Sequence, residues 1–203
     1  KVSYGQLRSY CSGRELDSVT NYPMAYALFD FLLHRTNAFD LNNSLAGQRE
    51  RYPAPMYYAL MNLLGSHDTV RALSVLCGAP HRDALPREQQ AHVRFDGEAL
   101  ETGKRRLKLA SLLQFCLPGV PTVYYGDEAG MQGMADPFNR ATYPWGQEDG
   151  ALLRHYRTLA RLRTQLAALH RGLAAYAAAG PDVFCVLRAT QNRRDAFGRL
   201  APN

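Results

Sequence analysis

The spacing of apolar residues predicts a helix near the start of the chain. Its apolar face is formed by residues at i, i+3, i+4, i+7 and i+8, namely Ala25, Leu28, Phe29, Leu32 and Leu33. Pro23 suits the first turn of such a helix, because its missing N–H would be unpaired there anyway. Directly before it, LDSVT at 16–20 has the character of a short strand.

Two further apolar runs predict strands. YYALMNLLG at 57–65 has no polar alternation and suits a strand buried on both faces, although periodicity alone also allows a helix. VPTVYYG at 120–126 follows a Pro-Gly turn and is the third strand candidate. Polar residues at 36–43 and the YPAP at 52–55 frame a short helix between the first two strands.

Helical patterns follow the second and third strands. Thr69 is placed to cap a helix that runs through Leu76 and ends at Gly78. Residues 80–103 are polar and irregular, which predicts a surface excursion with one short helix, and 104–117 is helical again. A long helix begins near Asp149, and its inner side carries Leu152, Tyr156, Leu159 and Leu166.

The alternation of strands and helices predicts an α/β fold with a parallel sheet. Each strand ends in a polar segment, NYP, GSHDT or GDEAGM, so chemistry is expected at the carboxyl ends of the strands. Past Gly172 the chain changes to short, strand-like segments separated by turn residues. We therefore expect two domains, 1–172 and 173–203, of which the second begins a β domain.

Composition narrows the function classes. The 203 residues are 46% apolar, as in ordinary globular proteins. The net charge of +6 comes from scattered Lys and Arg, so no nucleic-acid partner is expected. No apolar stretch is long enough to span a membrane, and no membrane partner is expected. The first residue is Lys, so we expect a processed chain or a piece of a longer one.

The four cysteines, at positions 11, 77, 116 and 185, have no metal-ligand spacing. Their mostly apolar neighbours favour small buried thiols in a reducing, cytoplasmic compartment, with structural disulfides as the less favoured alternative. Neither a metal nor a cofactor is expected.

His67 and Asp68 follow the second apolar run directly, and taken alone they would suit an ordinary turn or helix cap equally well. However, three segments in this order, LLGSHDTVR, LLQFCLPGVPTVYYGDEAGM and DPFNRATYPWGQED, resemble the later part of the catalytic barrel of glycoside hydrolase family 13, the α-amylase family. The likeness is greatest to its neopullulanase and cyclomaltodextrinase branch, and it extends to about residue 170. It implies a (β/α)8 barrel in which the three strands are the sixth to eighth, followed by the start of a β-sandwich.

The resemblance also implies site residues. Asp68 matches the carboxylate that orients the substrate and stabilises the transition state, and His67 matches a substrate-binding group. Asp136 and Arg140 match the family's D-P-x-x-R segment beside the substrate, where they would bind sugar hydroxyls or one another. The alternative for these two is a surface ion pair that holds the loop.

Other polar residues at the strand ends have weaker claims. The segment RATYPW departs from the family pattern R-R-P-M-x-W, so Tyr143 and Trp145 could stack on a sugar ring or simply pack. Asp127 and Glu128 are expected to be structural, with Glu128 binding backbone amides or a nearby Arg. For Asn21 and Tyr22, packing at the helix entry and substrate contact are equally favoured.

The family's nucleophile Asp and acid Glu follow its fourth and fifth strands, and KVSYGQLRSY resembles the stretch just downstream of that Glu. The resemblance therefore implies a C-terminal fragment of a retaining hydrolase of α-glucans such as starch, pullulan, maltooligosaccharides or cyclodextrins. Alone it should be inactive, and its open sheet edges should favour self-association or pairing with the missing N-terminal half of the barrel. The alternatives are a non-catalytic α-glucan-binding module and a purely structural interaction protein.

Overall fold

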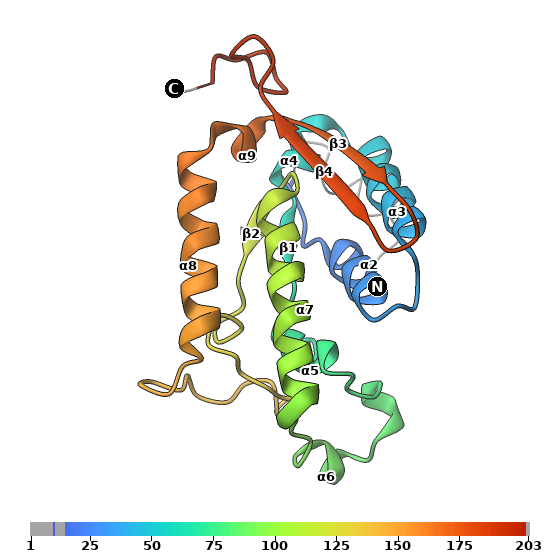
Figure 1. The fold of residues 1–203 in the computed structure, drawn as a ribbon, viewed down its shortest axis with the longest axis vertical. Coiled ribbons are helices and arrows are strands. Elements are labelled where there is room, and N and C mark those ends of the chain that lie inside the picture. The colour runs from blue at the N-terminus through green and yellow to red at the C-terminus, as the bar shows by residue number, and fades with distance from the viewer. Residues whose placement is uncertain (1–9, 11–14, 202–203) are drawn as a thin grey trace.

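The computed structural model describes residue 10 and residues 15–201 and shows helices around a small parallel sheet, with a separate hairpin near the C-terminus (Figure 1). In chain order the elements are α2 (Tyr22–Leu32), α3 (Ala38–Arg51), α4 (Ala54–Ala59), β1 (Met61–Leu63), α5 (Ala72–Leu76), the 3-10 helix η1 (Arg82–Ala84), α6 (Arg87–Gln90), α7 (Gly97–Cys116), β2 (Val120–Thr122), α8 (Gly150–Gln165), α9 (Ala167–Arg171), β3 (Leu173–Ala178) and β4 (Phe184–Ala189).

The sheet is parallel, as predicted. β1 and β2 pair in register from Met61 opposite Val120 to Leu63 opposite Thr122. On the other side of β1, Thr20 forms a single parallel bridge to Met61. The strand predicted at 16–20 is thus confirmed only as one bridged residue, but three segments in chain order do lie side by side. Their carboxyl ends consequently meet at one edge of the sheet.

α2 confirms the first predicted helix. The side chain of Asn21 accepts a hydrogen bond from the Met24 N–H at 3.3 Å and caps the helix, and Pro23 lies in the first turn. The buried face of α2 is Met24, Ala25, Leu28, Phe29 and Leu32. Leu33, which we expected on this face, is the half-buried residue that ends the helix.

α3 is longer than predicted because the polar residues before it are its capping signal. The Asn37 side chain accepts from the Asp40 N–H at 3.1 Å, and the Asp40 carboxylate accepts from the Asn37 N–H at 3.2 Å. This reciprocal capping box stabilises the first turn, so the helix begins at Ala38 within the polar segment.

The strand prediction for residues 57–65 is wrong in its first half. Residues 54–59 form α4, which buries Met56 and Tyr57, and only Met61–Leu63 form a strand. A tertiary contact accompanies the helix, because the Tyr57 hydroxyl is 2.7 Å from that of Tyr176 in the C-terminal hairpin. The unbroken apolar run therefore indicated that the segment is buried, but it did not distinguish a helix from a strand.

The predicted cap of α5 is also wrong. The helix begins at Ala72, Arg71 occupies the cap position, and no side chain caps it. The Thr69 hydroxyl instead accepts from the Ser66 N–H at 3.0 Å, within the turn that follows β1. Gly78, whose φ of +97° suits glycine, follows the helix as predicted.

The two long helices α7 and α8 run alongside each other (Figure 1). α7 begins at Gly97 rather than at residue 104, so part of the predicted surface excursion is helical. Asp149 caps α8 by accepting from the Leu152 N–H at 2.9 Å. Three of its predicted inner residues are buried, namely Leu152, Tyr156 and Leu159. The prediction is wrong for Leu166, which follows the helix and is 48% exposed.

The strand-like segments past Gly172 form an antiparallel hairpin of β3 and β4 that packs against α3 (Figure 1). Tyr176, Phe184 and Val186 of this hairpin lie against the main hydrophobic core. The Tyr58 hydroxyl donates to the Gly172 carbonyl at 2.9 Å. The hairpin is therefore joined to the preceding helices by both apolar and polar contacts, while the domain boundary near residue 172 stays a prediction.

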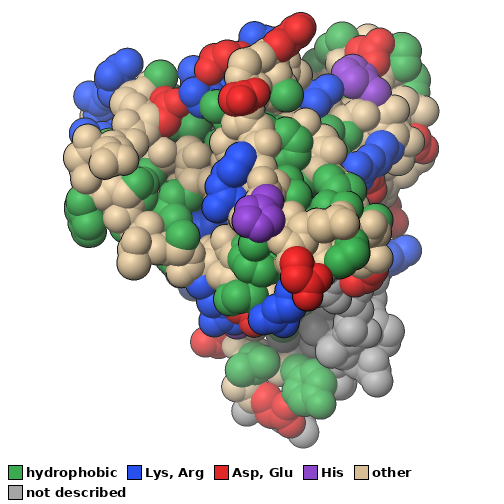
Figure 2. Space-filling view, turned by 90° about the horizontal axis from the view of Figure 1, so that it is seen from below, with side chains coloured by type: hydrophobic (Ala, Val, Ile, Leu, Met, Phe, Trp, Pro, Cys, Tyr) green, Lys and Arg blue, Asp and Glu red, His purple; other side chains and the backbone are tan. Residues whose placement is uncertain are grey.

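The prediction of buried cysteines is wrong for Cys185, which is exposed, whereas Cys77 and Cys116 are half-buried. These three are free thiols, and Cys11 lies outside the described residues. No helix among the described residues is long and apolar enough to cross a membrane. On the face in Figure 2, Lys and Arg side chains are interspersed with acidic and apolar ones, so the positive charge there is spread out.

Candidate functional site

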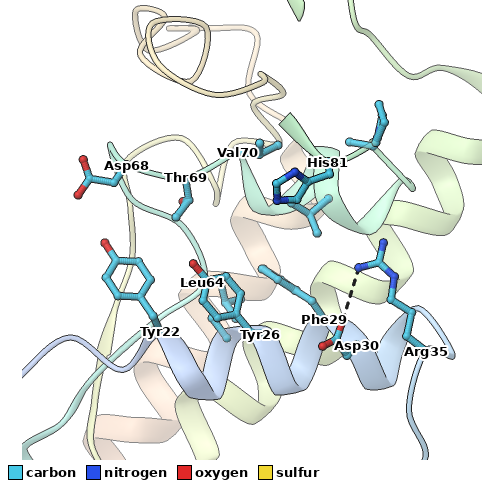
Figure 3. Close-up of a pocket in the computed structure, with 14 residues that line it drawn as sticks. Tyr22, Tyr26, Phe29, Asp30, Arg35, Leu64, Asp68, Thr69, Val70 and His81 are labelled. Atoms are coloured by element: carbon cyan, nitrogen blue, oxygen red, sulfur yellow. Dashed lines mark hydrogen bonds and ion pairs between the residues drawn. The ribbon is translucent and has the colours of Figure 1, made fainter. Parts of the chain in front are cut away.

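The turn after β1 carries the most accessible of the predicted site residues. His67 Nε2 and Asp68 Oδ1 are 3.2 Å apart, and their side chains are 61% and 65% exposed. In Figure 3, Asp68 extends outward above Tyr22, which comes from the first turn of α2. The pair therefore lies at the carboxyl end of the sheet, where a ligand can reach both side chains.

Local hydrogen bonds hold the backbone of this turn. The Ser66 N–H donates to the Thr69 hydroxyl at 3.0 Å, and the Asp68 N–H donates to the Ser66 hydroxyl at 3.1 Å. The Tyr22 hydroxyl lies 2.9 Å from that same Ser66 oxygen. The exposed His–Asp pair is thus presented on a turn whose shape is set by its neighbours.

Asn139, which sequence reasoning missed, holds the same turn from the loop after β2. Its side chain is completely buried, and Nδ2 donates to the carbonyls of Ser66 at 3.3 Å, His67 at 2.9 Å and Thr69 at 2.7 Å. The only signal in the sequence was its place in DPFNR, next to a candidate site residue. The loop after β2 thereby determines how the loop after β1 is presented.

Asp136 and Arg140 pair with each other, with 2.6 Å between Asp136 Oδ1 and Arg140 Nε. Both are partly exposed, at 59% and 46%. Arg140 Nη2 also donates to the His67 carbonyl at 3.3 Å. Three of the predicted site residues, His67, Asp68 and Arg140, therefore meet at one place, and Asp136 joins them through Arg140.

A second acid–base pair lies beneath the site and is buried. Arg71 Nη1 is 3.4 Å from Asp127 Oδ1, and the two side chains are 0% and 3% exposed. The same guanidinium donates to the Tyr125 carbonyl and lies 4.3 Å from the ring centroid of Tyr124. Burial raises the pKa of Asp127 to about 7, although the Arg71 charge acts in the opposite direction. Arg71, which sequence reasoning also missed, thus connects the segment after β1 to the loop after β2 through buried contacts.

The remaining candidates have structural contacts. Glu128 Oε2 accepts from the Gly126 N–H at 2.9 Å, which is the backbone contact expected of it. Asn21 is 5% exposed and donates to Asn62 Oδ1 at 3.0 Å, in addition to capping α2. Its contacts thus match the expectation of packing at the helix entry.

The two aromatic residues left open by the sequence differ in exposure. The rings of Tyr143 and Trp145 have centroids 4.6 Å apart, so they pack on each other. Trp145 is nevertheless 81% exposed, which leaves one ring of the pair accessible. Within the described residues, no group of three or more His, Cys, Asp or Glu side chains could hold a metal ion.

Comparisons with known proteins identify the family of the chain. A family model described as the catalytic domain of alpha amylase matches residues 2–149. Over 202 residues the chain is 37% identical to an amylopullulanase of Thermoanaerobacter thermohydrosulfuricus, an alignment that covers 94% of this chain and 13% of that protein. It is 35% identical to a cyclomaltodextrinase of a Bacillus species, with 80% of this chain and 25% of that protein covered.

A solved structure has the same fold. It is the cyclic alpha-maltosyl-(1→6)-maltose hydrolase of Arthrobacter globiformis in complex with cyclic alpha-maltosyl-(1→6)-maltose, with a TM-score of 0.76 and 26% identity. The match covers 93% of this chain and 38% of that one. The chain thus spans a small part of the relatives that it matches. The resemblance inferred from the three motifs is confirmed, and the chain belongs to the α-amylase family of glycoside hydrolases.

Proposed function

We propose that this chain supplies the substrate-orienting part of a retaining α-glycoside hydrolase that acts on α-glucans such as starch, pullulan, maltooligosaccharides or cyclodextrins. The observation that carries the proposal is the exposed His67–Asp68 pair on a turn held by buried Asn139. Family membership supplies the reaction class, and a relative of the same fold binds a cyclic maltosyl-maltose.

In this proposal Asp68 faces the hydroxyls of the sugar at the reacting bond. A fixed carboxylate that accepts hydrogen bonds from them stabilises the positive charge of an oxocarbenium-like transition state more than it stabilises the ground state. His67 donates to a neighbouring hydroxyl and fixes the pose of the ring. The rigid turn matters because a misplaced carboxylate would lose most of this preference.

Arg140 and Asp136 complete the binding surface in this proposal. A guanidinium has five N–H donors, and Arg140 uses one toward Asp136 and another toward the His67 carbonyl. Its other donors, together with the exposed Asp136 carboxylate, are suited to sugar hydroxyls. The ion pair then both positions the loop and binds substrate, so the two alternatives from the sequence are combined.

The proposal assigns Thr20, β1 and β2 to strands six to eight of a (β/α)8 barrel, and the hairpin of β3 and β4 to the start of a β-sandwich. In the family the nucleophile and the acid belong to earlier strands, and retention requires these two carboxylates roughly 5 to 5.5 Å apart. We expect this chain alone to bind α-glucan without cleaving it, because Asp68 is neither of those groups.

The apolar residues exposed along the sheet support a further part of the proposal. Met61, Val120 and Val123 are 40%, 50% and 38% exposed. A second copy of the chain, or the remaining strands of the barrel, would cover them and the open edge of β2. Size-exclusion chromatography with light scattering is expected to show dimers or larger species, and a monodisperse monomer would contradict self-association.

The test of the proposed function is a pair of measurements on this chain. Isothermal titration with maltotriose should show binding that Asp68→Asn weakens at least about tenfold, as expected for loss of a hydrogen-bonded carboxylate. A reducing-sugar assay with maltooligosaccharides should show no hydrolysis. Absent binding would contradict the proposal, and hydrolysis by the chain alone would show that it contains its own nucleophile and acid.

A non-catalytic α-glucan-binding module is the second candidate, and the same exposed pair favours it. The two candidates predict different results when the earlier strands are supplied on a second polypeptide, such as the first part of a related cyclomaltodextrinase barrel. Recovery of hydrolysis that depends on Asp68 would favour the enzyme. Binding that persists without recovered hydrolysis would favour the module.

A further inference from the structure

The buried carboxylate of Asp127 lies against both ends of the turn that carries His67 and Asp68. At the start of the turn, Gly65 packs on it so closely that a Cβ added to this glycine would lie 2.7 Å from Asp127 Oδ2. At the end of the turn, Arg71 Nη1 lies 3.4 Å from Asp127 Oδ1. One side chain of the loop after β2 therefore contacts the residues that border the turn on either side.

The charge of Arg71 depends on Asp127 for its compensation. Within the described part of the chain, Asp127 is the only carboxylate that forms an ion pair with Arg71. The guanidinium otherwise faces the Tyr125 carbonyl and the rings of Tyr124 and Tyr125, whose centroids lie 4.3 and 4.7 Å away. Its Nε and Nη2 are buried without a hydrogen-bond partner. Because arginine keeps its proton in proteins, a neutral Asp127 leaves a cation in the interior without an anion.

Movement of Arg71 is transmitted to the turn through the backbone. Arg71 occupies the cap position of α5 and follows Asp68 by three residues. Its N–H donates to the Gly133 carbonyl at 3.0 Å. An uncompensated buried cation is costly, and the chain relieves this cost by opening toward water. Such an opening breaks the contact with Gly133 and displaces the segment that presents Asp68.

The charged and titratable groups around Asp127 come from several elements. Arg71 faces it from the start of α5, Glu128 is its neighbour in the loop, and Tyr156 faces it from α8. Gly65, from the segment after β1, carries no charge. Burial raises the pKa of Tyr156 well above its ordinary value, so this residue stays neutral. Burial also raises the pKa of Asp127 to about 7, against the effect of Arg71, so Asp127 changes its charge near neutral pH.

We propose that Asp127 is a positioning residue for Asp68: its ionised form, paired with Arg71, fixes the turn in the conformation that binds sugar, and its protonated form releases it. The inference rests on the proposed function, because that function makes Asp68 the sugar-binding carboxylate. It adds that affinity for an α-glucan depends on the charge of a buried residue out of contact with the ligand. A turn that holds its binding conformation for part of the time weakens the apparent affinity by that fraction.

The test measures maltotriose binding by isothermal titration on the parent and on Asp127→Asn, which is neutral at every pH. At about pH 8.5 the parent should bind at least about fivefold more tightly than the variant, the lower end of a typical coupling between two sites. At about pH 5.5 the two affinities should be equal, because Asp127 is then protonated in the parent. His67 and Asp68 are present in both proteins, so their own titration cancels in the ratio of the affinities.

A merely structural role of Asp127 predicts the opposite trend. The unfolded carboxyl ionises at a lower pH than the buried one, so the stability that Asp127 contributes falls as the pH rises toward 7. An affinity that followed stability would fall with it, whereas the positioning role predicts a rise. By linkage, saturating maltotriose should also lower the pKa of Asp127, which an NMR titration of its carboxyl carbon measures with and without the sugar.

A second variant changes the geometry and keeps the charge. Gly65→Ala places a methyl group where the Asp127 carboxylate lies and should displace it from Arg71. At about pH 8.5 it should therefore weaken maltotriose binding about fivefold, as Asp127→Asn does. Gly47→Ala on α3 is the matched control, since a Cβ there meets no atom within 4 Å, and it should bind as the parent does. Circular dichroism checks that each variant is folded.

The outcomes separate this inference from the proposed function. If the parent binds maltotriose but its affinity ratio to Asp127→Asn is the same at every pH, the positioning role is overturned, even where Asp68→Asn abolishes binding. Absent binding by the parent at every pH would instead contradict the proposed function, and this inference with it. A ratio that rises with pH between folded proteins, together with a pKa of Asp127 that maltotriose lowers, supports the positioning role.

Discussion

Two acid–base pairs lie close together around the turn after β1, and they differ mainly in burial. His67 and Asp68 are more than half exposed, with 3.2 Å between Nε2 and Oδ1. Arg71 and Asp127 are at most 3% exposed, with 3.4 Å between Nη1 and Oδ1. The two pairs therefore have similar N···O distances, but water surrounds the first pair and the low-dielectric interior surrounds the second.

The difference indicates separate roles. An exposed pair contributes little to stability, because water solvates each charge and salt screens their attraction. Its side chains can exchange water for ligand hydroxyls at small cost. A buried pair cannot do so, and the loss of one partner leaves an uncompensated charge in the interior. The buried pair is accordingly the scaffold, and the exposed pair is the binding surface in our proposal.

The largest effect is expected from breaking the buried pair. Arg71→Met should lower the free energy of unfolding by about 3–5 kcal/mol at pH 8, where Asp127 is ionised and would be left without its cation in the interior. Urea unfolding measures this change. Arg140→Met is the matched control, since it removes a partly exposed guanidinium from the same region and should cost about 1 kcal/mol or less. Equal costs for the two variants would contradict the assignment of scaffold and surface.

The second prediction concerns pH and the same pair. Burial raises the pKa of Asp127 from an ordinary carboxyl value to about 7, so between about pH 4 and 7 the folded chain holds a proton that the unfolded chain has lost. Stability due to this group is therefore fully present at low pH and falls as the pH rises toward 7, by up to about 4 kcal/mol.

Urea unfolding of the parent and of Asp127→Asn across this pH range measures the contribution. As the pH rises from 4 to 7, the parent should lose stability relative to Asp127→Asn. Other carboxyl groups titrate in both proteins, and their contribution cancels in the difference. A difference independent of pH would mean that Arg71 keeps Asp127 ionised throughout the range.

The third prediction concerns Asn139, which holds the turn that carries the exposed pair. Asn139→Ala should lower the free energy of unfolding by about 2 kcal/mol, because three carbonyls lose their shared donor. Amide hydrogen exchange should also become faster at residues 66–69. Asn43→Ala, at an exposed position on α3, is the control and should change neither measurement by much. Unchanged exchange in Asn139→Ala would show that the turn holds its shape by itself.

Elements specified by nearby residues were predicted well from sequence. α2 has its cap at Asn21, its proline in the first turn and its apolar face within one short segment, so no distant contact was needed to identify it. The turn with His67 and Asp68 was likewise found, because polar residues directly followed a buried strand. Local chemistry and strand order thus placed this pair at the strand ends, and the resemblance to the α-amylase family then selected it as a candidate site.

Features that depend on distant partners were missed. The division of residues 54–63 into α4 and β1 involves the Tyr57–Tyr176 contact, which joins positions far apart in the chain. Arg71 resembled any other arginine in a helix start until Asp127 and Tyr125 were seen around it. Asn139 gave no signal of its three carbonyl contacts. The periodicity of hydrophobic residues reports burial and local propensity, but it does not show which polar groups contact each other in the fold.

The smallest effect on stability is expected from the exposed pair, and it is the sharpest test of its role. His67→Ala and Asp68→Asn should each change the free energy of unfolding by about 0.5 kcal/mol or less, since both side chains are mostly solvated and their attraction is screened. The same variants should lose most of their affinity for maltotriose if the pair is a binding surface. A variant that loses stability and affinity together would mean that the pair acts by holding the turn, as Asn139 does, and that ligand contact lies elsewhere.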